Sequence, residues 1–133
     1  VLEARGRVKD AEQQYTAAVT IHRGASPKGS PALATALVTL GHLLTKDRRA
    51  ADAEPILREA LEFRRQSLPA GHRGIGDAEA ALAECLLQQN KPAEVGALLG
   101  SAAKTAPVGP TSLLYDQKAV QGLMARLKTG TGG

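Results

Sequence analysis

The sequence aligns with itself without gaps when it is shifted by 42 residues. Three segments then fall into register: residues 6–12 (GRVKDAE), 48–54 (RRAADAE) and 90–96 (NKPAEVG). Small and apolar residues also coincide, as in the sets Tyr15, Leu57 and Leu99, and Ala18, Ala60 and Ala102. An ungapped period of this length is typical of chains built by stacking copies of one two-element unit. We therefore expect a repeat array.

Within one period the apolar residues recur at helical spacing, which predicts two helices. Ser30 and Pro31 are suited to begin the first helix, as a hydroxyl N-cap followed by proline at the first helical position. Pro55 is expected in the first one or two turns of the second helix, where a missing N–H does least harm. The inward residues of the two helices are Leu33, Leu37, Leu40, Leu44, and then Ala53, Ile56, Leu57, Ala60, Leu61 and Leu68.

The next period repeats this pattern, and its end departs from it. Asn90 is predicted to cap the second helix of this unit, and Pro92 is predicted to help open it. After Lys104 the period fails, and a helix over residues 110–128 is predicted to cover the apolar end of the array. Its apolar residues are Leu113, Leu114, Val120, Leu123, Met124 and Leu127. Residues 130–133 are expected to form a flexible tail.

The predicted fold is a single all-α domain over residues 1–129, a right-handed α-solenoid of antiparallel helix hairpins. Its units are placed at about 1–30, 31–72 and 73–107, which makes two and a half repeats followed by the capping helix. The composition agrees, because hydrophobic residues make up 43% and aromatic residues only 2%. Alanine and leucine must then fill the core, and both are strong helix formers.

Several functional classes find no support in the residues. His22, His42 and His72 have no partner at i, i+4, so we expect neither a metal nor another cofactor. Cys85 is interpreted as a small buried hydrophobe rather than a nucleophile. Basic residues recur in the turns, but aromatic residues that could stack on bases are lacking, so nucleic acid is not favoured. We expect the protein not to be an enzyme.

The sequence predicts neither a membrane-spanning segment nor a signal peptide. No segment approaches the ~20 apolar residues needed to cross a bilayer. The first residues are charged and do not resemble a signal peptide, which favours the cytoplasm. The chain begins with Val1 instead of methionine. We interpret it as part of a larger protein.

The repeat resembles the 42-residue tetratricopeptide repeat of the kinesin-light-chain type, which is also common in bacterial multidomain proteins. The resemblance covers roughly residues 1–105. It is carried by residues 6–12, by Ala60-Leu61 with Arg64, and by linkers in which Pro31 and His72 each keep half of a His-Pro pair. It implies a superhelix whose first helices line a concave groove that binds a protein or peptide.

The family's groove often carries an asparagine that grips the peptide backbone, and Thr39 and Ala81 stand at that position here. The same helix faces carry residues of mixed charge: Thr35, Thr39, His42 and Lys46, then Asp77, Ala81, Glu84 and Gln88. One hypothesis makes these eight residues a partner-binding site for a peptide. The alternative is a solvated helix face. A second functional hypothesis is a structural role, in which the repeats form a homodimer or space out other domains.

Overall fold

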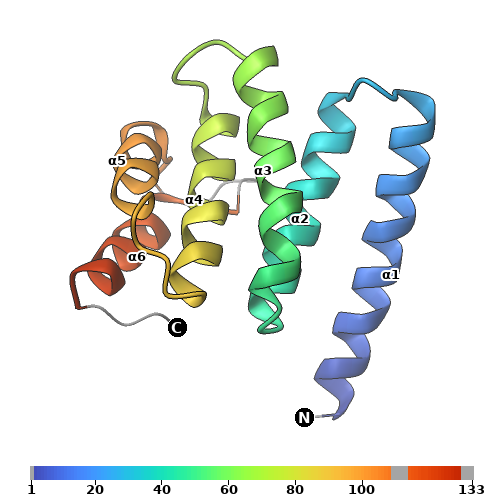
Figure 1. Ribbon diagram of the computed structural model, residues 1–133, viewed down its shortest axis with the longest axis horizontal. Helices are drawn as coiled ribbons and strands as arrows, with labels where there is room; N and C mark the ends of the chain where they lie inside the picture. Colours follow the sequence, from blue (N-terminus) through green and yellow to red (C-terminus); the bar gives the residue numbers. More distant parts are fainter. Residues whose placement is uncertain (1, 109–113, 130–133) are drawn as a thin grey trace.

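The computed structural model describes residues 2–108 and 114–129, with side chains from Gly6 onward. These residues form α1 (Leu2–Ala25), α2 (Pro31–Lys46), α3 (Ala50–Ser67), α4 (Arg73–Gln88), α5 (Val95–Thr105) and α6 (Gln117–Thr129). Within these two ranges the chain forms no strand. The helices stand in a row from α1 at one end to α5 and α6 at the other (Figure 1). The prediction of an all-α helical repeat solenoid is confirmed.

The row is held by contacts between successive helices. Each helix from α1 to α4 packs on the next one, and α2 also touches α4. The last helix, α6, folds back onto α5 and α4. The two first helices of the units, α2 and α4, therefore lie next to each other on one side of the stack. This places the residues that were predicted to bind a partner on neighbouring helices.

The core consists mainly of leucine and alanine, as the composition requires. Leu57, Leu82, Leu86 and Leu99 are its largest fully buried side chains. Gly41 lets α2 and α3 approach each other closely, because a Cβ added to it would lie 2.4 Å from Cγ and Cδ2 of Leu57. Alanine and glycine at such contacts give the row its tight helix spacing.

The local predictions for α2 and α3 are confirmed. The Ser30 Oγ accepts a hydrogen bond from the Leu33 amide at 3.0 Å, and Pro31 is the first residue of α2. Pro55 lies in the second turn of α3, which begins at Ala50. At this position proline removes a single backbone hydrogen bond close to the helix end, which limits its cost.

The turns inside the two units repeat the same backbone geometry. Arg48 and Asn90 have positive φ angles of 64° and 59°, and they lie 42 residues apart. The amide that follows each of them bonds back to the helix just completed, as Arg49 N to Leu44 O at 2.8 Å and Lys91 N to Leu86 O at 2.9 Å. A left-handed residue with this return bond is a common helix C-terminus.

The prediction that Asn90 caps α5 is wrong, because Asn90 ends α4. Asparagine tolerates the left-handed conformation better than most residues, which suits it to this turn. The following helix begins only at Val95, after Glu94, whose side chain makes no capping hydrogen bond. Pro92 lies before the helix, and its carbonyl accepts a bond from the Val95 amide at 3.2 Å.

The last helix begins at Gln117, later than the predicted 110. Asp116 sets this start, because its carboxylate accepts a hydrogen bond from the Ala119 amide at 2.8 Å. Leu114 lies outside the helix and is exposed, whereas Leu113 falls outside the described residues. The predicted tail at 130–133 also falls outside them. The proposed repeat boundaries remain a prediction. None of the described helices is long and apolar enough to span a membrane.

Candidate partner-binding face

The eight predicted partner-binding residues form four pairs 42 residues apart, one member on α2 and one on α4. The α2 members remain accessible: Thr35 and Lys46 are exposed, and Thr39 and His42 are half-buried. The α4 members differ. Asp77, Ala81 and Glu84 are only 6%, 1% and 5% exposed, and Gln88 is half-buried. The alternative of a solvated helix face is therefore wrong for α4, because residues 114–116 and α6 pack on this helix. The role of these residues in binding a partner stays a prediction.

The cover begins with residues 114–116, which we call the strap. The carboxylate of Asp77 accepts hydrogen bonds from two consecutive backbone amides of the strap, Leu114 at 3.3 Å and Tyr115 at 2.8 Å. Burial raises the pKa of Asp77, and these two bonds oppose that rise in part. The Asp77 carboxylate thus binds the main chain of the strap. This contact does not depend on the side chains of the bound segment.

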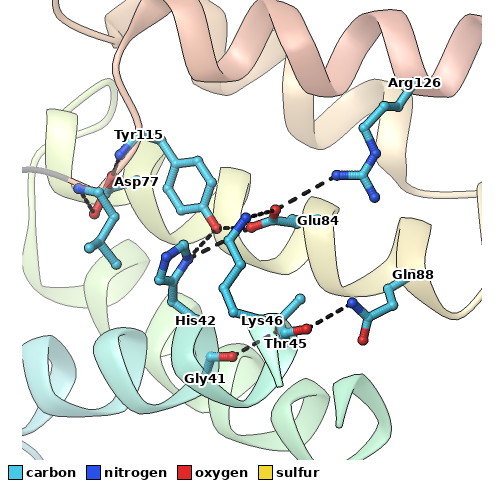
Figure 2. A network of polar contacts seen from close by, with 10 residues as sticks. Gly41, His42, Thr45, Lys46, Asp77, Glu84, Gln88, Tyr115 and Arg126 are labelled. Carbon is cyan, nitrogen blue, oxygen red and sulfur yellow. Dashed lines mark hydrogen bonds and ion pairs between the residues drawn. The ribbon is translucent and has the colours of Figure 1, made fainter. Parts of the chain in front are cut away.

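Tyr115 carries the specific contact between the strap and both helices (Figure 2). Its hydroxyl donates to Glu84 Oε1 at 2.5 Å and lies 2.8 Å from Nδ1 of His42. Since the phenolic O–H points to Glu84, the Nδ1–H of His42 donates a hydrogen bond to the tyrosine oxygen. The two rings meet edge to face, with centroids 5.4 Å apart and planes at 89°. Burial raises the pKa of Tyr115 well above its ordinary value, so the phenol stays protonated.

Glu84 is the centre of the charged groups at this site. Its Oε2 lies 2.8 Å from Nζ of Lys46 and 3.7 Å from Nη1 of Arg126, which comes from α6. Burial raises the pKa of Glu84, but the hydrogen bonds from Lys46 and Tyr115 more than reverse this and leave the pKa below its ordinary value. For His42, burial lowers the pKa, and the nearby Glu84 partly offsets that effect. The site therefore holds an ionised carboxylate beside a neutral imidazole at pH 7.

The rest of the face joins the helices of the stack. Arg64 of α3 donates to the Gly74 carbonyl at 2.8 Å and reaches the Thr35 hydroxyl at 3.3 Å. Gln88 donates through its amide to the Thr45 carbonyl of α2 at 2.7 Å. The Thr39 hydroxyl bonds only within its own helix, to the Thr35 carbonyl. Thr35, Thr39 and Lys46 thus form the accessible part of the face.

Sequence analysis missed Tyr115 and Arg126, because both lie beyond the part of the chain that follows the period. A signal was present. Tyr115 is one of only two tyrosines beside a single phenylalanine, so its burial was to be expected. Asp116, three residues before Ala119, could have marked the start of a helix and left Tyr115 outside it.

Two basic residues of the turns, Arg49 and Lys91, are paired with carboxylates. Arg49 Nη1 lies 2.6 Å from Glu12 Oε1, and Lys91 Nζ lies 3.2 Å from Glu54 Oε1. These two ion pairs are equivalent, because each residue of the second pair lies 42 positions after its counterpart in the first. Cations that face carboxylates contribute less to the attraction of phosphate than free ones. These two ion pairs thus connect neighbouring units of the stack.

The histidines His22 and His72 and the cysteine Cys85 lie in different parts of the stack. His22 is in the last turn of α1, and His72 is the N-cap of α4, where its Nδ1 accepts the Gly74 amide at 2.9 Å. Cys85 is fully buried and donates to the Ala50 carbonyl at 3.0 Å, and burial raises the pKa of its thiol. The prediction that Cys85 is buried is confirmed. Across residues 6–108 and 114–129, no three His, Cys, Asp or Glu side chains gather as a metal site would require.

Comparison with known proteins gives one match. The family model of the tetratricopeptide repeat matches residues 33–74, which span most of α2, all of α3 and the first residues of α4. No curated protein matched the chain, and neither did any solved structure. Tetratricopeptide repeats generally mediate contacts between proteins. Residues 33–74 are therefore a tetratricopeptide repeat, set in a stack of like helices.

Proposed function

We propose that this chain is a protein-interaction module that binds an extended segment of a partner on the face formed by α2 and α4. The observation that supports it is the grip of Asp77 on two consecutive backbone amides of the strap. A site that binds a main chain in this way can receive any extended peptide, with neighbouring side chains adding selectivity. The match to a tetratricopeptide repeat supports the same function.

The accessible part of this face favours a polar partner segment. Lys46 keeps 58% of its side chain exposed although it also contacts Glu84, so it can meet a carboxylate of the partner. Thr39 and Thr35 lie about two and three turns before Lys46 along α2 and offer small hydroxyl groups instead of an apolar surface. A bound segment would therefore run along α2 and make mostly hydrogen bonds and ion pairs.

A bulky charge in the middle of this face should block binding. We expect Thr39→Arg to weaken the binding of peptides selected on the wild-type chain from a random displayed library by at least about tenfold, or ~1.4 kcal/mol. Fluorescence polarisation with labelled peptides measures the effect. Ser101→Arg is the matched control, because Ser101 is exposed on α5, and it should change the Kd less than about twofold. Equal losses in the two variants would contradict the proposal, and so would a library that yields no binder.

An alternative function is self-association through α1. Tyr15 is 36% exposed, whereas Leu57 and Leu99, its counterparts in α3 and α5, are fully buried. Ile21 on the same helix is 68% exposed. A second copy of the chain would cover these side chains. In that case light scattering should give twice the chain mass, and Tyr15→Lys should restore the mass of one chain. A monomer at every concentration would eliminate this alternative.

A further inference from the structure

The strap occupies α4 in the manner of a bound peptide. Two of its amides bond to one carboxylate, that of Asp77, and one of its side chains reaches between His42 and Glu84. Main-chain bonds together with a pocket for a single side chain are how proteins bind extended segments. The strap is therefore a ligand that the chain supplies to itself.

The contacts that hold the strap differ from those that hold the stack. The joins between α2, α3, α4 and α5 bury leucine and alanine. The strap is held by hydrogen bonds to Asp77, Glu84 and His42, and its apolar contribution to the core is the ring of Tyr115. Behind it, α6 places Val120 and Leu123 in the same core. Polar groups that leave such an interface form hydrogen bonds with water instead, so they add little to the net cost of release, which comes mainly from exposing these few apolar side chains. Apolar helix joins have no such compensation.

The pocket selects a tyrosine hydroxyl. Glu84 accepts a hydrogen bond from the bound group and His42 donates one to it, and a phenol can take part in both at once. Phenylalanine would leave both groups without this partner inside a buried site. A phosphorylated tyrosine would bring a second negative charge against Glu84.

We infer that the strap is an intramolecular latch on the partner-binding face, and that the segment it competes with is an extended peptide carrying an unmodified tyrosine. The inference deepens the proposed function and rests on it, since it names the chemistry of the partner and the step that precedes its binding. The latch must leave α4 before a partner segment can bond to Asp77, so the chain's own end limits partner binding.

Hydrogen exchange of the wild-type chain tests the latch directly. If the strap opens while the stack stays folded, the Tyr115 amide and the amides of α6 will exchange at least about tenfold faster than those of α4, relative to their intrinsic rates. Nuclear magnetic resonance resolves these amides one by one. Exchange of Tyr115 at the rate of the α4 core would show that the strap leaves only when the whole chain unfolds, and would overturn the inference.

A peptide supplied in trans tests the selectivity. A labelled peptide of residues 112–118 should bind Tyr115→Ala at least about tenfold more tightly than it binds the wild type, because this variant removes the competing side chain. The same peptide with phenylalanine for tyrosine should bind that variant about tenfold less tightly. Equal binding of the two peptides, or equal binding to the two proteins, would overturn the inference.

Three further measurements keep the outcomes separate. Circular dichroism shows whether Tyr115→Ala keeps its helices. Tyr115→Phe, which retains the ring, should bind the peptide with an affinity between those of the wild type and Tyr115→Ala. The Asp77→Asn change in the Tyr115→Ala chain should abolish most of the gain. If the library peptides still depend on Thr39 while the strap peptide fails to bind, the latch is refuted and the proposed function stands.

Discussion

Replacing Gly41 by alanine is expected to lower the free energy of unfolding by about 1–3 kcal/mol, although alanine is the better helix former. The added Cβ would lie 2.4 Å from two carbon atoms of Leu57. Leu57 is fully buried among other core residues, so it cannot swing away without disturbing them. The gain in helix propensity, about 1 kcal/mol, is smaller than this overpacking. Urea unfolding followed by circular dichroism measures the difference.

Gly122→Ala is the matched control for this change. Gly122 lies inside α6, and an added Cβ there would meet no atom within 4 Å. Its replacement should raise stability by about 0.5–1 kcal/mol, the opposite sign. Leu57→Ala alone should cost about 2–5 kcal/mol, and the double change with Gly41→Ala should cost less than the sum, because the new methyl group fills part of the cavity. A gain in stability for both glycine changes would contradict the close approach of α2 and α3 at Gly41.

Glu84→Ala is expected to destabilise the protein by about 2 kcal/mol, because it removes the acceptor of a buried hydroxyl. The Tyr115 hydroxyl would lose its partner, and Lys46 and Arg126 would lose the negative charge that lies between them. Glu84→Gln should lower the stability less, since the amide oxygen can still accept the hydrogen bond from the phenol. Urea unfolding gives the total, and hydrogen exchange in α6 shows how much of the loss falls on the strap.

An exposed ion pair serves as the comparison. Glu59 accepts from Arg23 at 2.6 Å, but both side chains are more than 40% exposed. Removing a partner from such a surface pair changes stability by less than about 1 kcal/mol. Glu59→Ala should therefore cost clearly less than Glu84→Ala. Equal effects would mean that Glu84 is solvated in solution and that the strap does not bury it.

The fold followed from the sequence wherever the information was local or periodic. The 42-residue spacing located the helices of the stack, and Ser30 with Pro31 marked the start of α2 correctly. Asn90 was misassigned because asparagine is favoured both at helix N-caps and in left-handed turns, and local sequence does not separate the two. Its equivalence to Arg48, which sits in the same turn, would have decided between them.

The site was predictable only in part. Periodicity placed Asp77 and Glu84 on the same side as His42 and Lys46, and the opposite charges of Lys46 and Glu84 suited a contact. What covers α4 depends on how the end of the chain folds back, 31 residues from Glu84 to Tyr115. No local sequence pattern encodes such a long-range contact. The sequence therefore could not predict that the strap covers part of α4.

The two equivalent ion pairs, Glu12 with Arg49 and Glu54 with Lys91, bear on how such a protein can change its length. In each pair a carboxylate of one unit contacts a cation that lies 37 residues later in the sequence. A tandem duplication of one whole 42-residue unit supplies a new carboxylate and a new cation at the correct spacing. An insertion of any other length breaks that spacing. Duplication of whole units therefore preserves this ion pair between neighbouring units. An insertion of another length leaves its carboxylate or its cation without the partner.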